Sequence, residues 1–121
     1  MSLSRITLGR LGEDLAAQHL RKAGYQILER NVRSRYGEID LVAKDGECVV
    51  FVEVRTMASG MMAPEESVTS RKQQQVASLG LRYLQDHSMT DAEWRADVVA
   101  IEMGQDGKPR RFEHYVNAVE A

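Results

Sequence analysis

Three acidic residues, Glu38, Asp40 and Glu53, stand in two neighbouring apolar segments that otherwise have the composition of buried strands. Between the segments lies Asp45-Gly46, a dipeptide typical of tight hairpin turns. Because side chains alternate along a strand, the spacing predicts that all three carboxylates share one face of a hairpin. Like charges that face each other destabilise a sheet, so we expect a cation between them. The hairpin is therefore a candidate metal site.

The register of this hairpin predicts how the acids could share an ion. A turn centred on Asp45-Gly46 places Asp40 opposite Phe51 and diagonal to Glu53. Mg²⁺ and Mn²⁺ prefer oxygen ligands, and Mg²⁺ usually takes one or two carboxylates with waters and substrate phosphate. Asp40 and Glu53, together with a backbone carbonyl, suit such an ion. The alternative is an exposed strand with alternating polar residues, and the apolar residues at 49–54 argue against it.

Two further acids could join the site. Glu13 lies at the margin of the buried stripe of a predicted first helix, where it can reach over the sheet. The alternative for Glu13 is a boundary position that faces solvent. Glu38 has three open roles, namely a base, a further ligand, or a water-exposed residue at the entrance of the strand.

Basic residues near the acids could bind phosphate. Arg55 shares the face of Glu53, where its guanidinium can hold a scissile phosphate or simply neutralise a carboxylate. Arg71 and Lys72 stand near the start of a second predicted helix, where they form either a phosphate-binding corner or a solvated helix end. The three histidines lack the mutual spacing of a metal or triad motif, and we expect them to be structural or surface residues.

The composition is that of one soluble domain spanning residues 1–121, with 43% hydrophobic and 28% charged residues. No apolar run approaches the ~20 residues of a membrane helix, and the start of the chain lacks the apolar region of a signal peptide. We therefore expect a cytoplasmic protein that does not enter a membrane. Cys48 is the only cysteine, which excludes an intrachain disulfide and a cysteine-based zinc site.

Charge is unevenly distributed along the chain, although the net charge is only −2. Residues 1–36 carry seven Lys or Arg and three acids, whereas residues 37–121 carry nine Lys or Arg and fifteen acids. An acidic pocket beside a basic surface suits a metal-dependent enzyme that acts on a polyanion, although solvated charges could also segregate in this way by chance. The candidate nucleic-acid-binding residues are Arg30, Arg33, Arg35, Arg71 and Lys72.

Hydrophobic periodicity predicts two helices and five strands in an α/β fold. The predicted helices are 8–23 and 67 or 70 to 87, and the predicted strands are 25–31, 37–44, 47–55, 95–102 and a weaker 110–119. We expect a basic connection at 31–35 and a loop at 56–64. Gly9 and Gly12 lie in the first turns of the first helix, where we expect close approach of another chain segment or a ligand. A mixed central sheet with a helix on each face accommodates these elements.

The order of the motifs resembles a known family. Gly37-Glu38-Ile39-Asp40, followed by Phe51-Val52-Glu53-Val54-Arg55, resembles the PD-(D/E)XK, restriction-endonuclease-like superfamily. The chain is more closely similar to the YraN-like family of small bacterial proteins. That closer resemblance extends almost over the whole chain, through Gly9-x-x-Gly12-Glu13, Asn31-Val32-Arg33, Ser67-Val68-x-x-x-Arg71-Lys72 and Arg95-Ala96-Asp97-Val98-Val99.

The resemblance implies an αβββαβ core and a set of roles. Asp40 and Glu53 would be metal ligands, and Glu13 would join them as a helix-borne acid like that of the similar archaeal Holliday-junction resolvases. Arg55 occupies the place of the superfamily's catalytic lysine, and because arginine stays protonated it cannot activate water as a base. Lys72 would then supply an ammonium from the second helix.

Three functions are open at this point. The first is a Mg²⁺- or Mn²⁺-dependent nuclease that cleaves phosphodiester bonds, acting on branched or structured DNA. The second is a nucleic-acid-binding module on a nuclease fold with weak or no catalysis, which Arg55 favours. The third is an interaction protein that keeps only the scaffold. A homodimer would suit a two-fold substrate such as a DNA junction.

Overall fold

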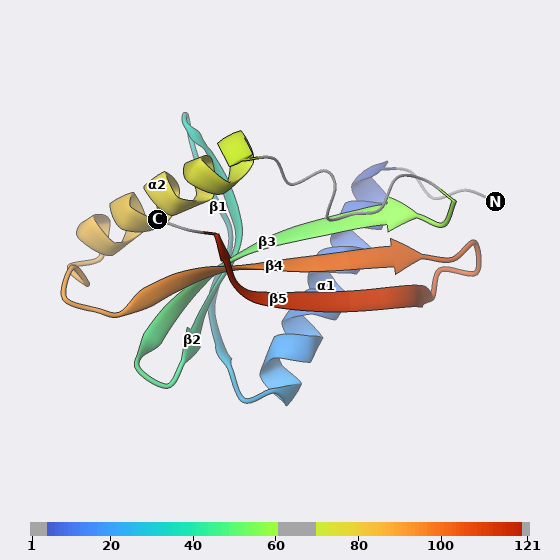
Figure 1. Ribbon diagram of the computed structural model, residues 1–121, viewed down its shortest axis with the longest axis horizontal. Coiled ribbons are helices and arrows are strands. Elements are labelled where there is room, and N and C mark those ends of the chain that lie inside the picture. Colours follow the sequence, from blue (N-terminus) through green and yellow to red (C-terminus); the bar gives the residue numbers. More distant parts are fainter. Residues whose placement is uncertain (1–4, 61–69, 120–121) are drawn as a thin grey trace.

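The computed structural model describes residues 5–60 and 70–119, which form two helices and five strands (Figure 1). The order along the chain is α, β, β, β, α, β, β. The elements are α1 (Arg5–Lys22), β1 (Gln26–Ser34), β2 (Gly37–Asp45), β3 (Cys48–Ala58), α2 (Ser70–Asp86), β4 (Trp94–Met103) and β5 (Pro109–Val119). The predicted α/β class and αβββαβ core are therefore confirmed. Within these described ranges, no helix has both the length and the hydropathy needed to cross a membrane.

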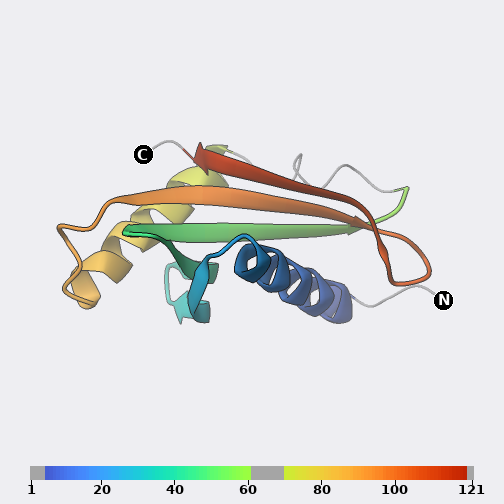
Figure 2. The same cartoon turned by 90° about the horizontal axis from the view of Figure 1, so that it is seen from below.

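The strands form one mixed sheet in the order β1-β2-β3-β4-β5. β1, β2 and β3 pair antiparallel, β3 and β4 pair parallel, and β5 returns antiparallel to β4. A parallel connection needs a crossover, which here contains α2. Figure 2 shows the sheet close to edge-on with α1 along one side, and α1 and α2 pack in separate apolar layers of the sheet. The predicted arrangement of a helix on each face is confirmed.

Two apolar layers hold the helices to the sheet. Phe51 and Tyr83 pack between the sheet and α2, and Leu20 and Val52 pack between the sheet and α1. The central strands β3 and β4 are buried on both faces, which explains their continuous apolar runs. Gly80 of α2 lies directly on Phe51, since a Cβ there would stand 2.6 Å from the ring.

The register of the β2–β3 hairpin differs from the prediction. Val42, and not Asp40, faces Phe51, because the turn is centred on Gly46-Glu47 and Asp45 pairs with Cys48. Gly46 has φ +60°, the value that a type II′ turn requires at its first central position. The register therefore shifts by two residues, and a shift of two leaves the paired residues 41–45 of β2 on their predicted faces.

Two predicted loops are partly strands. The basic segment 31–35 was expected to be a connection, but β1 continues to Ser34 and pairs with β2 as far as Gly37. Polar, half-exposed residues in this part of the hairpin lack the apolar alternation of a core strand. Similarly, β3 continues to Ala58 beside β4, so the first three residues of the predicted loop 56–64 are strand. Residues 61–69, including the alternative helix start at 67, lie outside the described residues.

β2 leaves β3 at a fork, which creates the space for a site. The pairing of β2 with β3 ends at Leu41 and Val52, whereas β2 stays paired with β1 beyond that point. In Figure 1 the β1–β2 hairpin rises steeply away from β3, β4 and β5. Ile39 and Leu41 pack in different apolar layers although they are two residues apart, so β2 twists at Asp40. We call this place the β2–β3 fork.

Candidate metal centre at the strand fork

Asp40 lies where the backbone ladder between β2 and β3 ends. Its Oδ2 atom accepts a hydrogen bond of 2.8 Å from the backbone N–H of Val54. The carboxylate therefore takes the place of the β2 backbone as the partner of this donor. Continuing the register by one step places Asp40 directly opposite Glu53, and not diagonal to it as predicted. The prediction that Asp40 and Glu53 lie close together is correct, although the register from which it was made is wrong by two residues.

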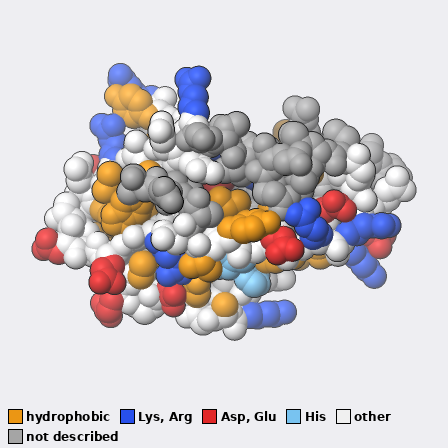
Figure 3. Space-filling view, in the orientation of Figure 1, with side chains coloured by type: hydrophobic (Ala, Val, Ile, Leu, Met, Phe, Trp, Pro, Cys, Tyr) orange, Lys and Arg blue, Asp and Glu red, His pale blue; other side chains and the backbone are white. Residues whose placement is uncertain are grey.

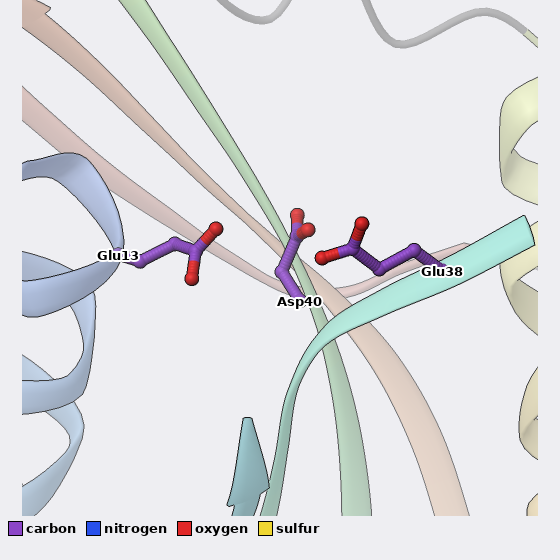
Figure 4. A group of neighbouring side chains, drawn as sticks. All are labelled: Glu13, Glu38 and Asp40. Carbon is purple, nitrogen blue, oxygen red and sulfur yellow. The ribbon is translucent and has the colours of Figure 1, made fainter. Parts of the chain in front are cut away.

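Three carboxylates from α1 and β2 converge at the fork. Glu13, Glu38 and Asp40 each offer an oxygen, and these oxygens all lie within 4.8 Å of one another. Figure 4 shows Glu13 reaching from α1 and Glu38 from β2 toward Asp40 between them. Two oxygens bound to one Mg²⁺ at ~2.1 Å lie at most ~4.2 Å apart, so small side-chain rotations would bring this set onto a single ion. We call these three residues the acidic cluster.

Close packing of α1 on β3 brings Glu13 to the fork. A Cβ at Gly12 would stand 1.9 Å from Oγ1 of Thr56, so the helix can approach β3 this closely only with glycine at that position. The expected close approach is thus confirmed for Gly12, whereas nothing lies within 4 Å of a Cβ at Gly9. Glu13 follows Gly12 directly and is half-buried between the helix and the sheet.

Glu53 lies on the other side of Asp40, in a basic environment. It is only 3% exposed, and its Oε1 atom is 3.0 Å from Nη2 of Arg55 and 3.8 Å from Nζ of Lys72. The predicted ligand set was Asp40, Glu53 and Glu13, but the structure groups Glu38 with Asp40 and Glu13. Asp40 therefore lies between the acidic cluster on one side and Glu53, with its ion-pair partners Arg55 and Lys72, on the other.

Burial makes the ionised form of these acids costly. Burial raises the pKa of Asp40 from its ordinary value of 3.8 to about 7, and the charge of Glu53 adds to the effect. Burial also raises the pKa of Glu53, although Arg55 and Lys72 act in the opposite direction. Burial and the charge of Asp40 likewise raise the pKa of Glu13. A divalent cation would relieve this repulsion, and an all-oxygen donor set fits Mg²⁺ or Mn²⁺.

Arg55 is held at the edge of this site by its contact with Glu53. Its Nε atom is buried and, of the buried side-chain nitrogens and oxygens in the described residues, is the one without a hydrogen-bond partner. Lys72 approaches from α2, which places two cations beside the same carboxylate. Arg55 thus shares the face of Glu53 as predicted, and Lys72, which was expected in a corner with Arg71, lies beside the same carboxylate.

The other predicted basic residues border the acidic cluster. Arg30 is 2.8 Å from Asp14 and 3.7 Å from Glu13, so it binds the helix that carries Glu13. Arg33 is 3.5 Å from Glu38, with its side chain 75% exposed. The two remaining residues of the predicted set lie in exposed positions, Arg35 at the tip of the β1–β2 hairpin and Arg71 in the first turn of α2.

A second polar network lies on β4 and β5 and was missed by sequence reasoning. Asp97 is fully buried, and its carboxylate lies 2.8 Å from Nε2 of His114 and 3.1 Å from Nε of Arg95. His114 is in turn 3.3 Å from His19 of α1. The histidines are 95 positions apart in the chain, so no local spacing could reveal this network. Its position between α1, β4 and β5 indicates a structural role.

Comparison with known proteins places the chain among bacterial relatives. It is 46% identical over 121 residues to a protein of Geobacter metallireducens, covering 99% of this chain and 98% of the relative. It is 41% identical over 119 residues to a protein of Pelotomaculum thermopropionicum, covering 98% and 99%. A Rhodococcus opacus protein is 45% identical over 114 residues, covering 93% and 96%. All three relatives carry the name UPF0102 protein.

A family model also matches residues 12–101, a range that includes the acidic cluster and Glu53. The family is described as uncharacterised protein family UPF0102. From this match and from the near full-length similarity to its members, the chain belongs to the UPF0102 family.

Proposed function

We propose that this protein is a metal-dependent nuclease that hydrolyses phosphodiester bonds of DNA. The observation that carries the proposal is the convergence of Glu13, Glu38 and Asp40, whose oxygens lie within 4.8 Å of one another. Acids gathered at such distances are most readily explained by a cation that binds between them. The resemblance to the PD-(D/E)XK superfamily, based on Asp40 and Glu53, supports the same chemistry.

In this proposal the acids of the fork hold the ion. Asp40 would be the central ligand, with Glu13 and Glu53 on its two sides. These residues would hold a divalent cation, which would supply a more acidic bound water and offset the charge that develops on the phosphate. Glu38 is partly exposed, and its carboxylate would accept the proton of the attacking water.

The two cations beside Glu53 would position the phosphate. Arg55 can donate two parallel hydrogen bonds to phosphate oxygens, and Lys72 adds a point charge from α2. Arginine stays protonated, so Arg55 would bind and stabilise charge without removing a proton. Lys72 would therefore take over part of the role that the superfamily's lysine has.

A surface of basic residues would bind the remaining backbone of the DNA. Arg33 and Arg35 of the β1–β2 hairpin and Arg71 of α2 are exposed near the fork. Contacts of this kind are electrostatic and independent of sequence, so the affinity should fall steeply with salt. The acidic cluster itself would repel DNA unless a cation occupies it.

A second candidate function is nucleic-acid binding without cleavage. The observation that favours it is the ion pair of 3.0 Å between Arg55 and Glu53, at the position of the superfamily's catalytic lysine. An arginine held by this carboxylate can bind phosphate but cannot act as a base.

A metal-binding measurement distinguishes a protein with a metal centre from an interaction protein that keeps only the nuclease-like scaffold. We expect Mn²⁺, followed by electron paramagnetic resonance, to bind the wild type, and Asp40→Asn and Glu13→Gln to lose this binding. Glu47→Gln is the matched control, because Glu47 is an exposed acid in the turn of the same hairpin. If the wild type binds no Mn²⁺, or if the control loses it equally, the metal centre is refuted.

Cleavage then decides between the two candidates. The substrates are single-stranded, duplex, flap and four-way DNA and an RNA strand, each with Mg²⁺ or Mn²⁺. We expect cleavage of at least one DNA substrate by the wild type and none by Glu53→Gln. Metal binding with no cleavage of any substrate would refute the nuclease and leave the binding module.

A further inference from the structure

The turn between β1 and β2 presents an aromatic ring that the turn itself does not require. Ser34 pairs with Gly37, so Arg35 and Tyr36 are the two central residues of the turn. Turns of this length favour glycine, asparagine and aspartate at the centre. Tyr36 is nevertheless 50% exposed at the tip of the hairpin. Tyr36 thus departs from the residue preference of the turn without contributing to the core, which makes its side chain a candidate for binding a ligand.

Two arginines from different elements lie against this ring. The guanidinium carbon of Arg35 is 5.0 Å from the centroid of the Tyr36 ring, and that of Arg82 of α2 is 4.8 Å away. We call Tyr36, Arg35 and Arg82 the arginine–tyrosine platform. In Figure 3 basic side chains gather at the upper left, where the tip of the β1–β2 hairpin stands beside α2 in Figure 1.

The platform is fixed in place by its backbone. Nε2 of Gln75 donates a hydrogen bond of 2.6 Å to the carbonyl oxygen of Tyr36, and the hydroxyl oxygen of Ser34 accepts one of 3.1 Å from its N–H. Gly37 has φ +143°, and a Cβ there would stand 2.7 Å from Gln75. The hydrogen bond from Gln75 therefore holds the tip of the β1–β2 hairpin against α2. Because the backbone is already ordered, binding a flat ligand there would cost little conformational entropy.

A hollow of about 630 Å³ opens beside the ring. It lies between Tyr36 and the outer surface of α2, where Gln75, Leu81 and Arg82 line it. Its volume is within the range of small-ligand pockets, roughly 300–1,000 Å³. Apolar, amide and guanidinium groups, together with the carboxylate of Asp86, thus surround a space next to a half-exposed aromatic ring, and Arg35 and Arg82 beside the ring supply the positive charge for an anion.

We propose that the arginine–tyrosine platform stacks an unpaired base of a single-stranded DNA segment, while Arg35 and Arg82 bind the flanking phosphates. A base stacks on an aromatic ring more strongly than an exposed guanidinium does, so the base can displace one arginine from the ring. The displaced arginine then binds phosphate. Every base has an aromatic face, so this recognition selects unpaired strands and not a sequence.

The position of the platform defines the substrate class, and this step rests on the proposed nuclease function. β2 leads from the platform directly to the acidic cluster, with four residues from Tyr36 to Asp40. At ~3.3 Å per residue this distance is about 13 Å, or about four steps of a stacked strand. The preferred substrates would therefore carry unpaired nucleotides about four positions from the cleaved bond, as flaps, gaps and branched DNA do.

Binding without metal tests the platform separately from catalysis. Fluorescence anisotropy in EDTA compares a single strand with a blunt duplex that has the same number of phosphates. We expect Tyr36→Ala to weaken binding of the single strand about 5- to 150-fold, the usual cost of losing one stacked base. Binding of the duplex should change less than about 2-fold, and Tyr36→Phe should behave like the wild type. The matched control Tyr115→Ala removes an exposed tyrosine from the opposite edge strand and should have no effect.

A base analogue and a salt titration test the two parts of the platform. The fluorescence of 2-aminopurine in the single strand should be quenched by the wild type and by Tyr36→Phe but not by Tyr36→Ala. Arg82→Ala should lower the slope of log affinity against log salt by about 1. Unchanged single-strand affinity of Tyr36→Ala, or equal losses for single strand and duplex, would overturn the proposal.

The outcome also separates this inference from the proposed nuclease function. If the wild type binds Mn²⁺ but Tyr36→Ala binds single strands normally, the metal centre stands and the platform is refuted. If single strands bind through Tyr36 but no metal binds, the platform stands and the nuclease is refuted. A wild type that binds no oligonucleotide, either in EDTA or with Mn²⁺, overturns the platform and leaves a protein partner for this surface.

Discussion

Replacing Asp40 by asparagine should stabilise the metal-free protein at pH 8. Burial and the neighbouring charge of Glu53 raise the pKa of Asp40 to about 7, so at pH 8 the folded protein must hold an unfavourable charge. Asparagine has nearly the same shape, and its side-chain oxygen can still accept the hydrogen bond from Val54 N–H. The substitution therefore removes the charge and keeps the contact.

The size of the effect follows from proton linkage. A pKa shift from 3.8 to about 7 corresponds to roughly 4 kcal/mol at 1.36 kcal/mol per unit. The repulsion is shared with Glu53, and part of the Asp40 side chain reaches water, so we expect about 2 kcal/mol. The unfolded chain loses the Asp40 proton near pH 4 and the folded protein near pH 7. The free energy of unfolding of the wild type should therefore decrease as the pH rises from about 4 to about 7. That of Asp40→Asn should not decrease for this reason, so the variant becomes the more stable protein.

Urea unfolding in EDTA at pH 5 and pH 8 measures this difference. We expect Asp40→Asn to exceed the wild type by less than about 1 kcal/mol at pH 5, where about a third of the interval between the two pKa values has been crossed, and by about 2 kcal/mol at pH 8. Saturating Mn²⁺ should reverse the order at pH 8, because only the wild type gains binding free energy. Glu47→Gln should follow the wild type throughout. A variant that is less stable than the wild type at pH 8 without metal would refute the electrostatic reasoning.

Three other perturbations test separate parts of the structure. Gly12→Ala should destabilise the protein by about 1–3 kcal/mol and weaken Mn²⁺ binding, because its Cβ would stand 1.9 Å from Oγ1 of Thr56; unchanged melting and Mn²⁺ affinity would contradict the packing of α1. Asp97→Ala should cost about 3–5 kcal/mol in urea unfolding at pH 7, because the largely buried guanidinium of Arg95 loses its anion and His114 loses a hydrogen-bond partner. Burial raises the pKa of Asp97, but hydrogen bonds to its ionised form lower it overall, so this stabilisation should exist above about pH 4 and disappear as the pH falls further; a constant loss down to pH 2 would refute it. Lys72→Ala should reduce cleavage by about 10²-fold if its ammonium stabilises the transition state, and Arg55→Lys should restore part of that loss; cleavage unaffected by Lys72→Ala would remove the lysine from the mechanism.

The element order and the two faces of the sheet were predictable because they depend on local hydrophobic patterns. The apolar runs of β3 and β4 and the helical stripes of α1 and α2 each identify their element without knowledge of its neighbours. Where β2 is paired with β3, at residues 41–45, the predicted faces survived an error of two residues in the register, since alternation along a strand has a period of two. The outer half of β1 was not predicted, because residues 31–35 are polar and gain their strand conformation by pairing with β2.

The sequence by itself determined that Asp40 and Glu53 lie near each other, because a hairpin joins their strands and the acids stand on the same side of it. Only the tertiary structure decided that Glu13 and Glu38 complete the acidic cluster. That decision depends on where β2 separates from β3 and on how closely Gly12 lets α1 approach Thr56. The contact between His19 and His114 depends in the same way on packing between distant segments. The hydrophobic pattern along a segment predicts whether that segment forms a strand or a helix. Contacts between segments that are distant in the sequence form only when the whole chain packs together.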